Sequence, residues 1–177
     1  MADLKLLAIS GSLRAKSRNT ALLREAVRLF GPADVAWGNL HLPLYDGDLE
    51  DAEGLPESVQ ILVDQIRAAD AIIVATPEYN KMIPGVLKNA LDWTSRAKPQ
   101  PWTDKPVAMI STAGRSGGEV AQYTLRHALA PFSPNLLLGP AYVVTFADKA
   151  FDEGDRLIAE ANVTGLQKLM DRLRAAV

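Results

Sequence analysis

The sequence predicts an α/β protein built on a doubly wound parallel sheet, and three observations lead to this fold class. Short apolar runs that are typical of strands alternate with longer segments that carry apolar residues at helical spacing. This alternation is typical of a parallel sheet with helices on both faces. No linker, repeat or low-complexity tract divides the 177 residues, a length that suits one domain. We therefore expect a single domain, residues 1–177, with about five parallel strands.

Five short apolar runs are expected to form the strands. They are, in chain order, residues 4–9, 34–37, 71–76, 106–112 and 135–144. The run at 71–76 is apolar almost throughout, which is typical of a parallel strand that is buried on both faces. Pro77 follows it directly and stops the strand, because proline has no N–H to donate to a neighbouring strand.

Five segments between and after the strands carry the helical pattern. They are residues 20–30, 56–69, 84–94, 117–130 and 153–176. In the first of them Leu22, Leu23 and Ala26 share one face, and Gly31 marks its end. Residues 39–54 are rich in Asp, Gly and Pro and are expected to form a long loop.

Composition excludes several classes of function. A net charge of −2 argues against a nucleic-acid partner, which would require a basic patch. Cysteine is absent, which excludes disulfides, thiol nucleophiles and Cys-ligated metals. His41 and His127 lack metal-type spacing, so no metal site is expected. No signal peptide or membrane-spanning segment is recognised. We therefore expect a cytoplasmic protein that binds neither nucleic acid nor membranes.

The loop between the first strand and the first helix, residues 10–20, has the chemistry of an anion site. Its sequence is Ser-Gly-Ser-Leu-Arg-Ala-Lys-Ser-Arg-Asn-Thr. A helix N-terminus offers unpaired N–H groups and the positive end of the helix dipole, and hydroxyl groups and an arginine add donors. Serine and asparagine before a helix are also ordinary caps, so the loop taken alone leaves both readings open. The candidate binding residues are Ser10, Ser12, Leu13, Arg14, Ser17, Asn19 and Thr20.

Two further loops leave the expected sheet at the same edge. Ligands of open α/β sheets bind where strands end, which makes Pro77, Glu78, Tyr79 and Asn80 candidates for contact with a flat ring through the backbone of an extended loop. The alternative is that Tyr79 only packs and Asn80 only stabilises a turn. The 111–118 loop has three glycines in five residues, which indicates close backbone approach to something flat, a mobile loop or a plain helix entry. Its candidate residues are Ser111, Ala113 and Gly114.

The run at 77–93, Pro-Glu-Tyr-Asn-Lys-Met-Ile-Pro-Gly-Val-Leu-Lys-Asn-Ala-Leu-Asp-Trp, carries a family resemblance. Together with the 10–20 loop it resembles the NAD(P)H-dependent FMN reductases, a flavodoxin-like family that includes quinone, azo-dye and chromate reductases. The resemblance implies strand order 2-1-3-4-5, which periodicity alone does not separate from half of a Rossmann fold. It also implies that the 10–20 loop binds the FMN phosphate, that residues 77–80 contact the isoalloxazine ring, and that the 111–118 loop borders its pyrimidine side. Many relatives have an aromatic residue where this chain has Arg18.

The function implied by this resemblance is a flavoenzyme. FMN would be the bound cofactor and NADPH or NADH the co-substrate, with hydride passed to FMN and two electrons then passed to quinone-like, azo or similar small-molecule acceptors. No catalytic side chain is required, since the flavin carries the chemistry. One open flavin face and the lack of a second nucleotide motif predict ping-pong kinetics. The resemblance also implies a homodimer or homotetramer, and the apolar helix at 84–94 suggests an interface near Leu91 and Trp93.

Two alternatives come from other functional classes. A flavodoxin-type electron carrier without nicotinamide activity would share the fold, but such carriers are typically strongly acidic and have a phosphate loop without arginine. The net charge of −2 and the presence of Arg14 argue against it. A relative that binds no flavin and acts through protein contacts is the other alternative, and the intact loops argue against it.

Overall fold

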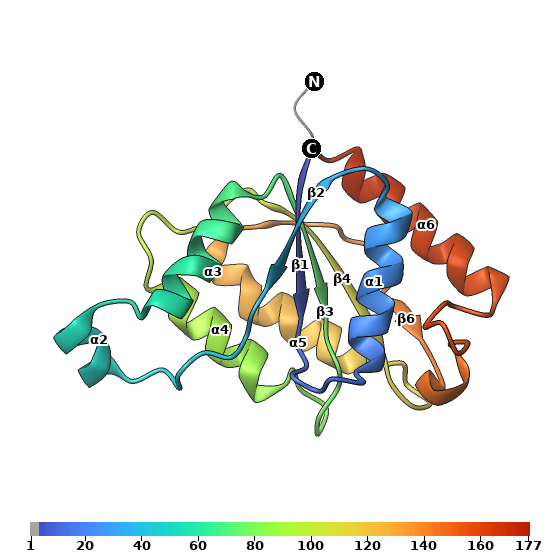
Figure 1. The fold of residues 1–177 in the computed structure, drawn as a ribbon, viewed down its shortest axis with the longest axis horizontal. Helices are drawn as coiled ribbons and strands as arrows, with labels where there is room; N and C mark the ends of the chain where they lie inside the picture. Colours follow the sequence, from blue (N-terminus) through green and yellow to red (C-terminus); the bar gives the residue numbers. More distant parts are fainter. Residues whose placement is uncertain (1–3) are drawn as a thin grey trace.

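A parallel sheet forms the centre of the computed structural model, which describes residues 4–177 (Figure 1). Its order is β2-β1-β3-β4-β5, and β6 pairs with β4 on the same side as β5. This order confirms the expected flavodoxin-like topology. The strands are β1 (Lys5–Ser10), β2 (Asp34–Gly38), β3 (Ala71–Ala75), β4 (Pro106–Thr112), β5 (Asn135–Leu136) and β6 (Tyr142–Val144).

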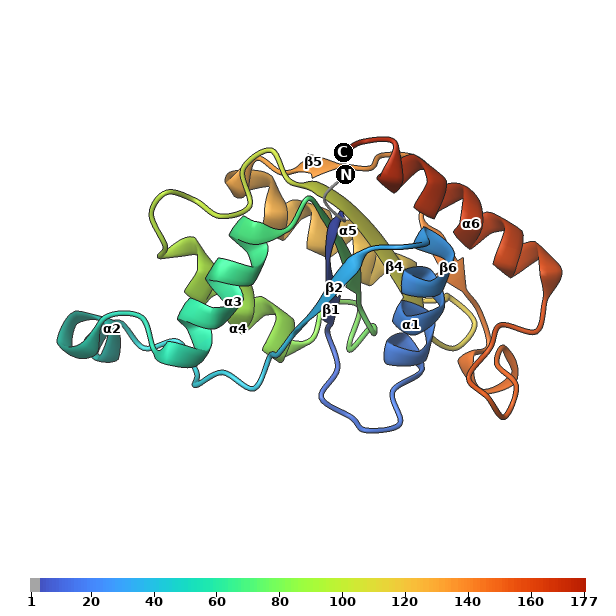
Figure 2. The ribbon, with the colours of Figure 1, turned by 45° about the horizontal axis from the view of Figure 1, so that its top comes forward.

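Helices cover both faces of the sheet (Figures 1 and 2). Helices α1 and α6 pack on one face and α3, α4 and α5 on the other, because successive strand residues point to opposite faces. In β1, for example, Leu6 belongs to the first core and Leu7 to the second. The α-helices are α1 (Arg18–Phe30), α2 (Gly47–Glu53), α3 (Glu57–Ala68), α4 (Gly85–Ser95), α5 (Glu119–Leu129) and α6 (Glu160–Arg174); Ala130–Phe132 and Ala147–Lys149 form short 3-10 turns. Among residues 4–177 no helix combines the length and the apolar character needed to cross a membrane.

The register of the strands brings three loops to one edge of the sheet. Ser10, the last residue of β1, pairs with Ala75, the last residue of β3, and Ala75 pairs in turn with Ile110 near the end of β4. All these strands are parallel, so the loops that follow them leave side by side. These loops are the three that contain the candidate residues.

Two expected elements differ from the structure, and both differences have a local cause. The segment 135–144, expected to contain the fifth strand, contains two strands, β5 and β6, which lie one after the other along β4 with a Gly139-Pro140 break between them. The last helix begins at Glu160 rather than at residue 153. The side chain of Asp152 accepts hydrogen bonds from the N–H groups of Gly154 and Arg156, which favours a turn over a helix.

The long loop expected over 39–54 contains a short helix, α2, which buries none of its residues. In Figure 1 this helix lies away from the body of the molecule, next to α3 and α4. The segment that leads into α2 is held by α4. Asn89 accepts from the Tyr45 N–H and donates to the Pro43 carbonyl. The same carbonyl also accepts from the indole N–H of Trp93. Asp46 caps α2 through its side chain.

Candidate functional site

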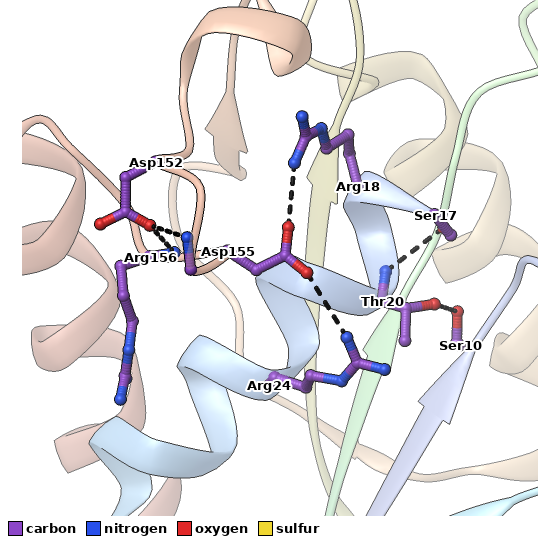
Figure 3. A network of polar contacts seen from close by, with 9 residues as sticks. Ser10, Ser17, Arg18, Thr20, Arg24, Asp152, Asp155 and Arg156 are labelled. Carbon is purple, nitrogen blue, oxygen red and sulfur yellow. Dashed lines mark hydrogen bonds and ion pairs between the residues drawn. The ribbon is translucent and has the colours of Figure 1, made fainter. Parts of the chain in front are cut away.

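The 10–20 loop is held at both ends by hydrogen bonds within the chain. The hydroxyl oxygens of Ser10, at the end of β1, and Thr20, in the first turn of α1, lie 2.8 Å apart (Figure 3). The Ser17 Oγ accepts from the Thr20 N–H and so caps α1. Gly11 donates its N–H to the last carbonyl of β3 at 2.7 Å. The side chains of Ser10, Ser17 and Thr20 therefore shape this loop.

Asn19 performs a different structural task. Its side chain is buried, its Nδ2 donates to the Thr112 carbonyl at 2.9 Å, and its Oδ1 accepts from the Thr112 N–H at 3.0 Å. This pair of bonds joins the start of α1 to the end of β4. Both ends of the amide are therefore held by the backbone of Thr112, and the backbone N–H of Asn19 is left without an acceptor in the chain.

Several donors of the 10–20 loop make no hydrogen bond or ion pair within residues 4–177. The N–H groups of Arg18 and Asn19 begin α1, where the first turn of a helix has no internal acceptors. The Arg14 guanidinium and the Lys16 ammonium are exposed and also line the cavity described below, together with Ser12. The positive end of the α1 dipole lies at the same place. This end of the site is suited to an anion.

The 77–82 loop closes into a tight turn instead of the extended loop expected from the sequence. Tyr79 and Met82 exchange backbone hydrogen bonds of 3.1 and 3.0 Å. Asn80 and Lys81 between them have φ angles of 53° and 66°, the left-handed conformation of a type I′ turn. Asparagine tolerates this conformation well, which matches the alternative in which Asn80 stabilises a turn. Tyr79 stays half exposed, and a Tyr ring of this kind offers an apolar face to a ligand.

The 111–118 loop approaches its own chain closely. A Cβ on Gly117 would lie 2.7 Å from the Val143 Cβ, so the glycine is required by the packing of β6. Ser111 is fully buried and its Oγ bonds to the Gly117 carbonyl and the Gln122 amide. Gly114 differs, because a Cβ added there would meet no atom within 4 Å. The close approach at Gly117 is therefore to the protein's own chain and not to a flat ligand, and Gly118 serves as the N-cap of α5.

The segment between β6 and α6, residues 147–156, lies across the site from the 77–82 loop and is called the far wall below. Ion pairs join it to α1 (Figure 3). Asp155 contacts Arg18 at 3.0 Å and Arg24 at 3.6 Å. Arg156 pairs with Glu25, whose side chain is only 3% exposed. Burial raises the pKa of Glu25, but hydrogen bonds and charge from Arg156 and a second arginine outweigh burial and leave this pKa below its usual value. The wall is thus fixed to the helix that begins at the anion end.

These elements enclose one cavity of about 720 Å³ at the carboxyl ends of β1, β3 and β4, within the usual size range of ligand pockets. Its two ends differ in chemistry. The start of α1 supplies cations and free N–H groups, and the other end presents neutral groups from Pro77, Tyr79, Ala113 and Gly114. The acidic residues of the lining are Glu78, next to Tyr79, and, in the far wall, Asp148, Asp152, Glu153 and Asp155. The donor set therefore fits a molecule with an anionic phosphate at one end and a flat, uncharged ring at the other, as in FMN.

The structure brings most of the predicted residues together. Those that line the cavity are Ser12, Arg14, Ser17, Asn19, Pro77, Glu78, Tyr79, Ala113 and Gly114. Leu13 lines an adjoining hollow with Tyr79 and Gly85. Those outside the cavity lining are Ser10, Thr20, Asn80 and Ser111.

Sequence reasoning missed the far wall, because residues 153 onward were expected to be helical. The residues that it adds to the cavity are Ala147, Asp148, Asp152, Glu153 and Asp155, and α1 adds Arg24. The Gly154-Asp155 pair was an available turn signal. Residues 4–177 contain no cluster of His, Asp or Glu that could hold a metal ion.

Comparison with known proteins agrees with this chemistry. Residues 4–149 match the family model of the NADPH-dependent FMN reductases. The chain is 42% identical to an NAD(P)H-dependent FMN reductase of Pseudomonas aeruginosa, over 97% of this chain and 94% of the relative. It is 39% identical to a quinone reductase of Escherichia coli, over 79% of this chain and 77% of the relative.

The solved structure of FerB, a flavoenzyme NAD(P)H:(acceptor) oxidoreductase from Paracoccus denitrificans, superposes with a TM-score of 0.86 at 32% identity. The match covers 97% of this chain and 96% of FerB. The family match over most of the chain and the flavodoxin-like strand order agree. The chain belongs to the NADPH-dependent FMN reductase family.

Proposed function

We propose that the cavity binds FMN with its phosphate at the start of α1 and its isoalloxazine ring between the 77–82 and 111–118 loops. The observation that carries this proposal is the gathering of unpaired cations and N–H groups at one end of the cavity, where α1 begins, opposite the mostly uncharged groups of the other two loops. Arg14 and Lys16 are the lining cations without an ion pair, because Arg18 and Arg24 are already paired with Asp155. Arg14 is the principal charged phosphate ligand, since a guanidinium can bind a phosphate through two hydrogen bonds. Ser12 and the N–H groups of Arg18 and Asn19 complete the phosphate site.

The family activity sets the reaction. When bound, FMN supplies the redox chemistry, which passes a hydride from NADPH or NADH and then two electrons to a small-molecule acceptor such as a quinone. The chain binds and orients the cofactor and keeps water from the ring. Buried Pro77 and the backbone of Tyr79 form one side of the ring end, and Ala113 and Gly114 form another. We assign no catalytic side chain.

Replacement of Arg14 by alanine tests the orientation of FMN. A charge-assisted hydrogen bond contributes about 1.5–3 kcal/mol, so Arg14→Ala should weaken FMN binding about 10–100-fold. Riboflavin lacks the phosphate, and its affinity should not change. Arg172→Ala, on α6 and outside the cavity lining, is the matched control. Fluorescence titration with both flavins measures the effect, and an equal loss for FMN and riboflavin would contradict the assignment.

We also propose that donor and acceptor use the same space over the ring and therefore follow ping-pong kinetics. The 10–20, 77–82 and 111–118 loops and the far wall all line the cavity, and we infer that a ring bound there has one face open to both substrates. Donor must then leave before acceptor enters. Double-reciprocal plots at several quinone concentrations should give parallel lines. Intersecting lines would mean that both substrates bind together.

The proposal includes a cytoplasmic homodimer or homotetramer in which residues 1–177 fold as one unit. An apolar hollow between α4 and α5 supports the assembly: Met82 and Tyr123 are half exposed at its edge, near Phe132. Leu91 lines this hollow and Trp93 does not, and both side chains are buried within their own subunit. A position near an interface stays a prediction for both residues. Light scattering at micromolar concentration checks the assembly. A particle of 19.1 kDa would contradict it.

A further inference from the structure

Helix α5 begins without a cap of its own. Its N-cap is Gly118, which has a φ of 86° and no side chain to accept a hydrogen bond. The cap is supplied from another loop: the Glu78 Oε2 accepts from the Ala121 N–H at 3.3 Å, across 43 positions of sequence. The Glu78 side chain is only 8% exposed. A carboxylate from the 77–82 loop thus occupies the positive end of the α5 dipole.

The other oxygen of the same carboxylate holds the turn. The Lys81 Nζ donates to the Glu78 Oε1 at 3.1 Å. Lys81 is one of the two residues in the left-handed conformation, which a lysine rarely adopts unless its surroundings hold it there. Glu78 therefore connects three features: the base of the 77–82 turn, its strained tip, and the first turn of α5, which directly follows the 111–118 loop.

We propose that Glu78 is a positioning residue, which caps α5 from the 77–82 loop and so holds together the two loops that border the ring end of the FMN cavity. Glu78 also lines that cavity, but the hydrogen bonds of its oxygens direct them to α5 and Lys81. The inference rests on the placement of FMN proposed above. It gives the side chain of Glu78 a role distinct from the backbone contact that the sequence predicts.

The consequence for binding distinguishes this role from that of a phosphate ligand. Loss of the carboxylate loosens the ring end and leaves the phosphate end intact. Glu78→Ala should therefore weaken the binding of FMN and of riboflavin by the same factor, about tenfold, whereas Arg14→Ala should weaken the binding of FMN alone. Glu78→Gln keeps an oxygen acceptor and should restore most of the affinity for both flavins, because one hydrogen bond to α5 can persist.

Glu119 offers a matched control in the same turn of α5. It is exposed, and its carboxylate accepts from the Tyr123 hydroxyl and makes no hydrogen bond or ion pair with the 77–82 loop. Glu119→Gln removes a negative charge near the α5 N-terminus but leaves the cap in place. Its affinity for both flavins should equal that of the unchanged protein. A tenfold loss in this variant would show that charge near α5, and not the cap, is responsible.

A measurement without flavin tests the cap directly. In the FMN-free protein, hydrogen exchange followed by NMR should show the Ala121 amide exchanging about tenfold faster in Glu78→Ala and unchanged in Glu119→Gln. If Glu78→Ala does not fold, Lys81→Gln can be used instead, because Lys81 is exposed. This variant should still bind FMN and riboflavin a few fold more weakly. Unchanged exchange at Ala121, or a loss confined to FMN, overturns the inference. An unchanged protein that binds neither flavin contradicts the FMN placement instead, and leaves the exchange result standing.

Discussion

Asn19 provides a test of whether a polar residue inside the candidate site binds ligand or supports the fold. Its amide makes two buried hydrogen bonds to the backbone of Thr112, at 2.9 and 3.0 Å. Asn19→Leu keeps the volume and leaves a buried N–H and a buried carbonyl without partners. Each unsatisfied group costs about 1–3 kcal/mol, so the free energy of unfolding should fall by about 3 kcal/mol.

Urea denaturation of the FMN-free protein measures this change, because bound cofactor would add its own stabilisation. With a slope of about 2 kcal/mol per molar urea, the midpoint should move down by about 1.5 M. Asn39→Leu is the matched control: Asn39 is exposed and accepts one hydrogen bond, from the His41 N–H, so its midpoint should hardly move. An unchanged midpoint for Asn19→Leu, together with a loss of FMN but not riboflavin affinity, would refute the reasoning and make the Asn19 side chain a phosphate ligand.

Two further predictions concern buried charge. The folded pKa of Glu25 lies below its usual 4.5, so its stabilisation is present above that pH and is lost as the pH falls through the folded value. Glu25→Gln should therefore lower the free energy of unfolding at pH 7, as measured by urea denaturation. Below pH 4.5 this free energy should fall less steeply with pH in the variant than in the unchanged protein. An identical pH profile for the two proteins would exclude a stabilising role for the Glu25 carboxylate. Lys105 donates to two carbonyls at the end of α3, both at 2.7 Å, while burial lowers its pKa. Lys105→Met should reduce the free energy of unfolding by about 1–3 kcal/mol. A urea midpoint equal to that of the unchanged chain would show that these two hydrogen bonds at the end of α3 are dispensable.

The sheet was predictable because its signals are local and strong. The runs in β1, β3 and β4 are apolar and buried on both faces, and the helical patterns of α1, α3 and α4 end at glycine, alanine or serine close to the expected positions. The loops of the candidate site that follow β1 and β3 could be predicted from the same signals. The 10–20 and 77–82 loops both lie where parallel strands end, and that placement depends only on strand order.

The rest depended on contacts between distant parts of the chain. The Asp152 side chain competes with helix formation through hydrogen bonds that no periodicity reveals, so α6 was expected seven residues too early. The cap from Glu78 to α5 and the link from Asn19 to Thr112 join segments 43 and 93 positions apart. Loop residue types indicated that polar groups would gather at this edge, but which of them remain free for a ligand is decided by tertiary structure.

The strand order also has a consequence for how the chain folds during synthesis. Strand β1 can pair with β2 soon after both are made, but its other edge pairs with β3, so that Leu6 waits for Ala71 about 65 residues later. At about 5–20 residues per second, a ribosome needs roughly 3–13 s to deliver that partner. During this interval the apolar run from Leu6 to Ile9, fully covered in the finished protein, has one open edge. When β3 emerges the open edge passes to β3, where Ile72 in turn waits for Val107 of β4.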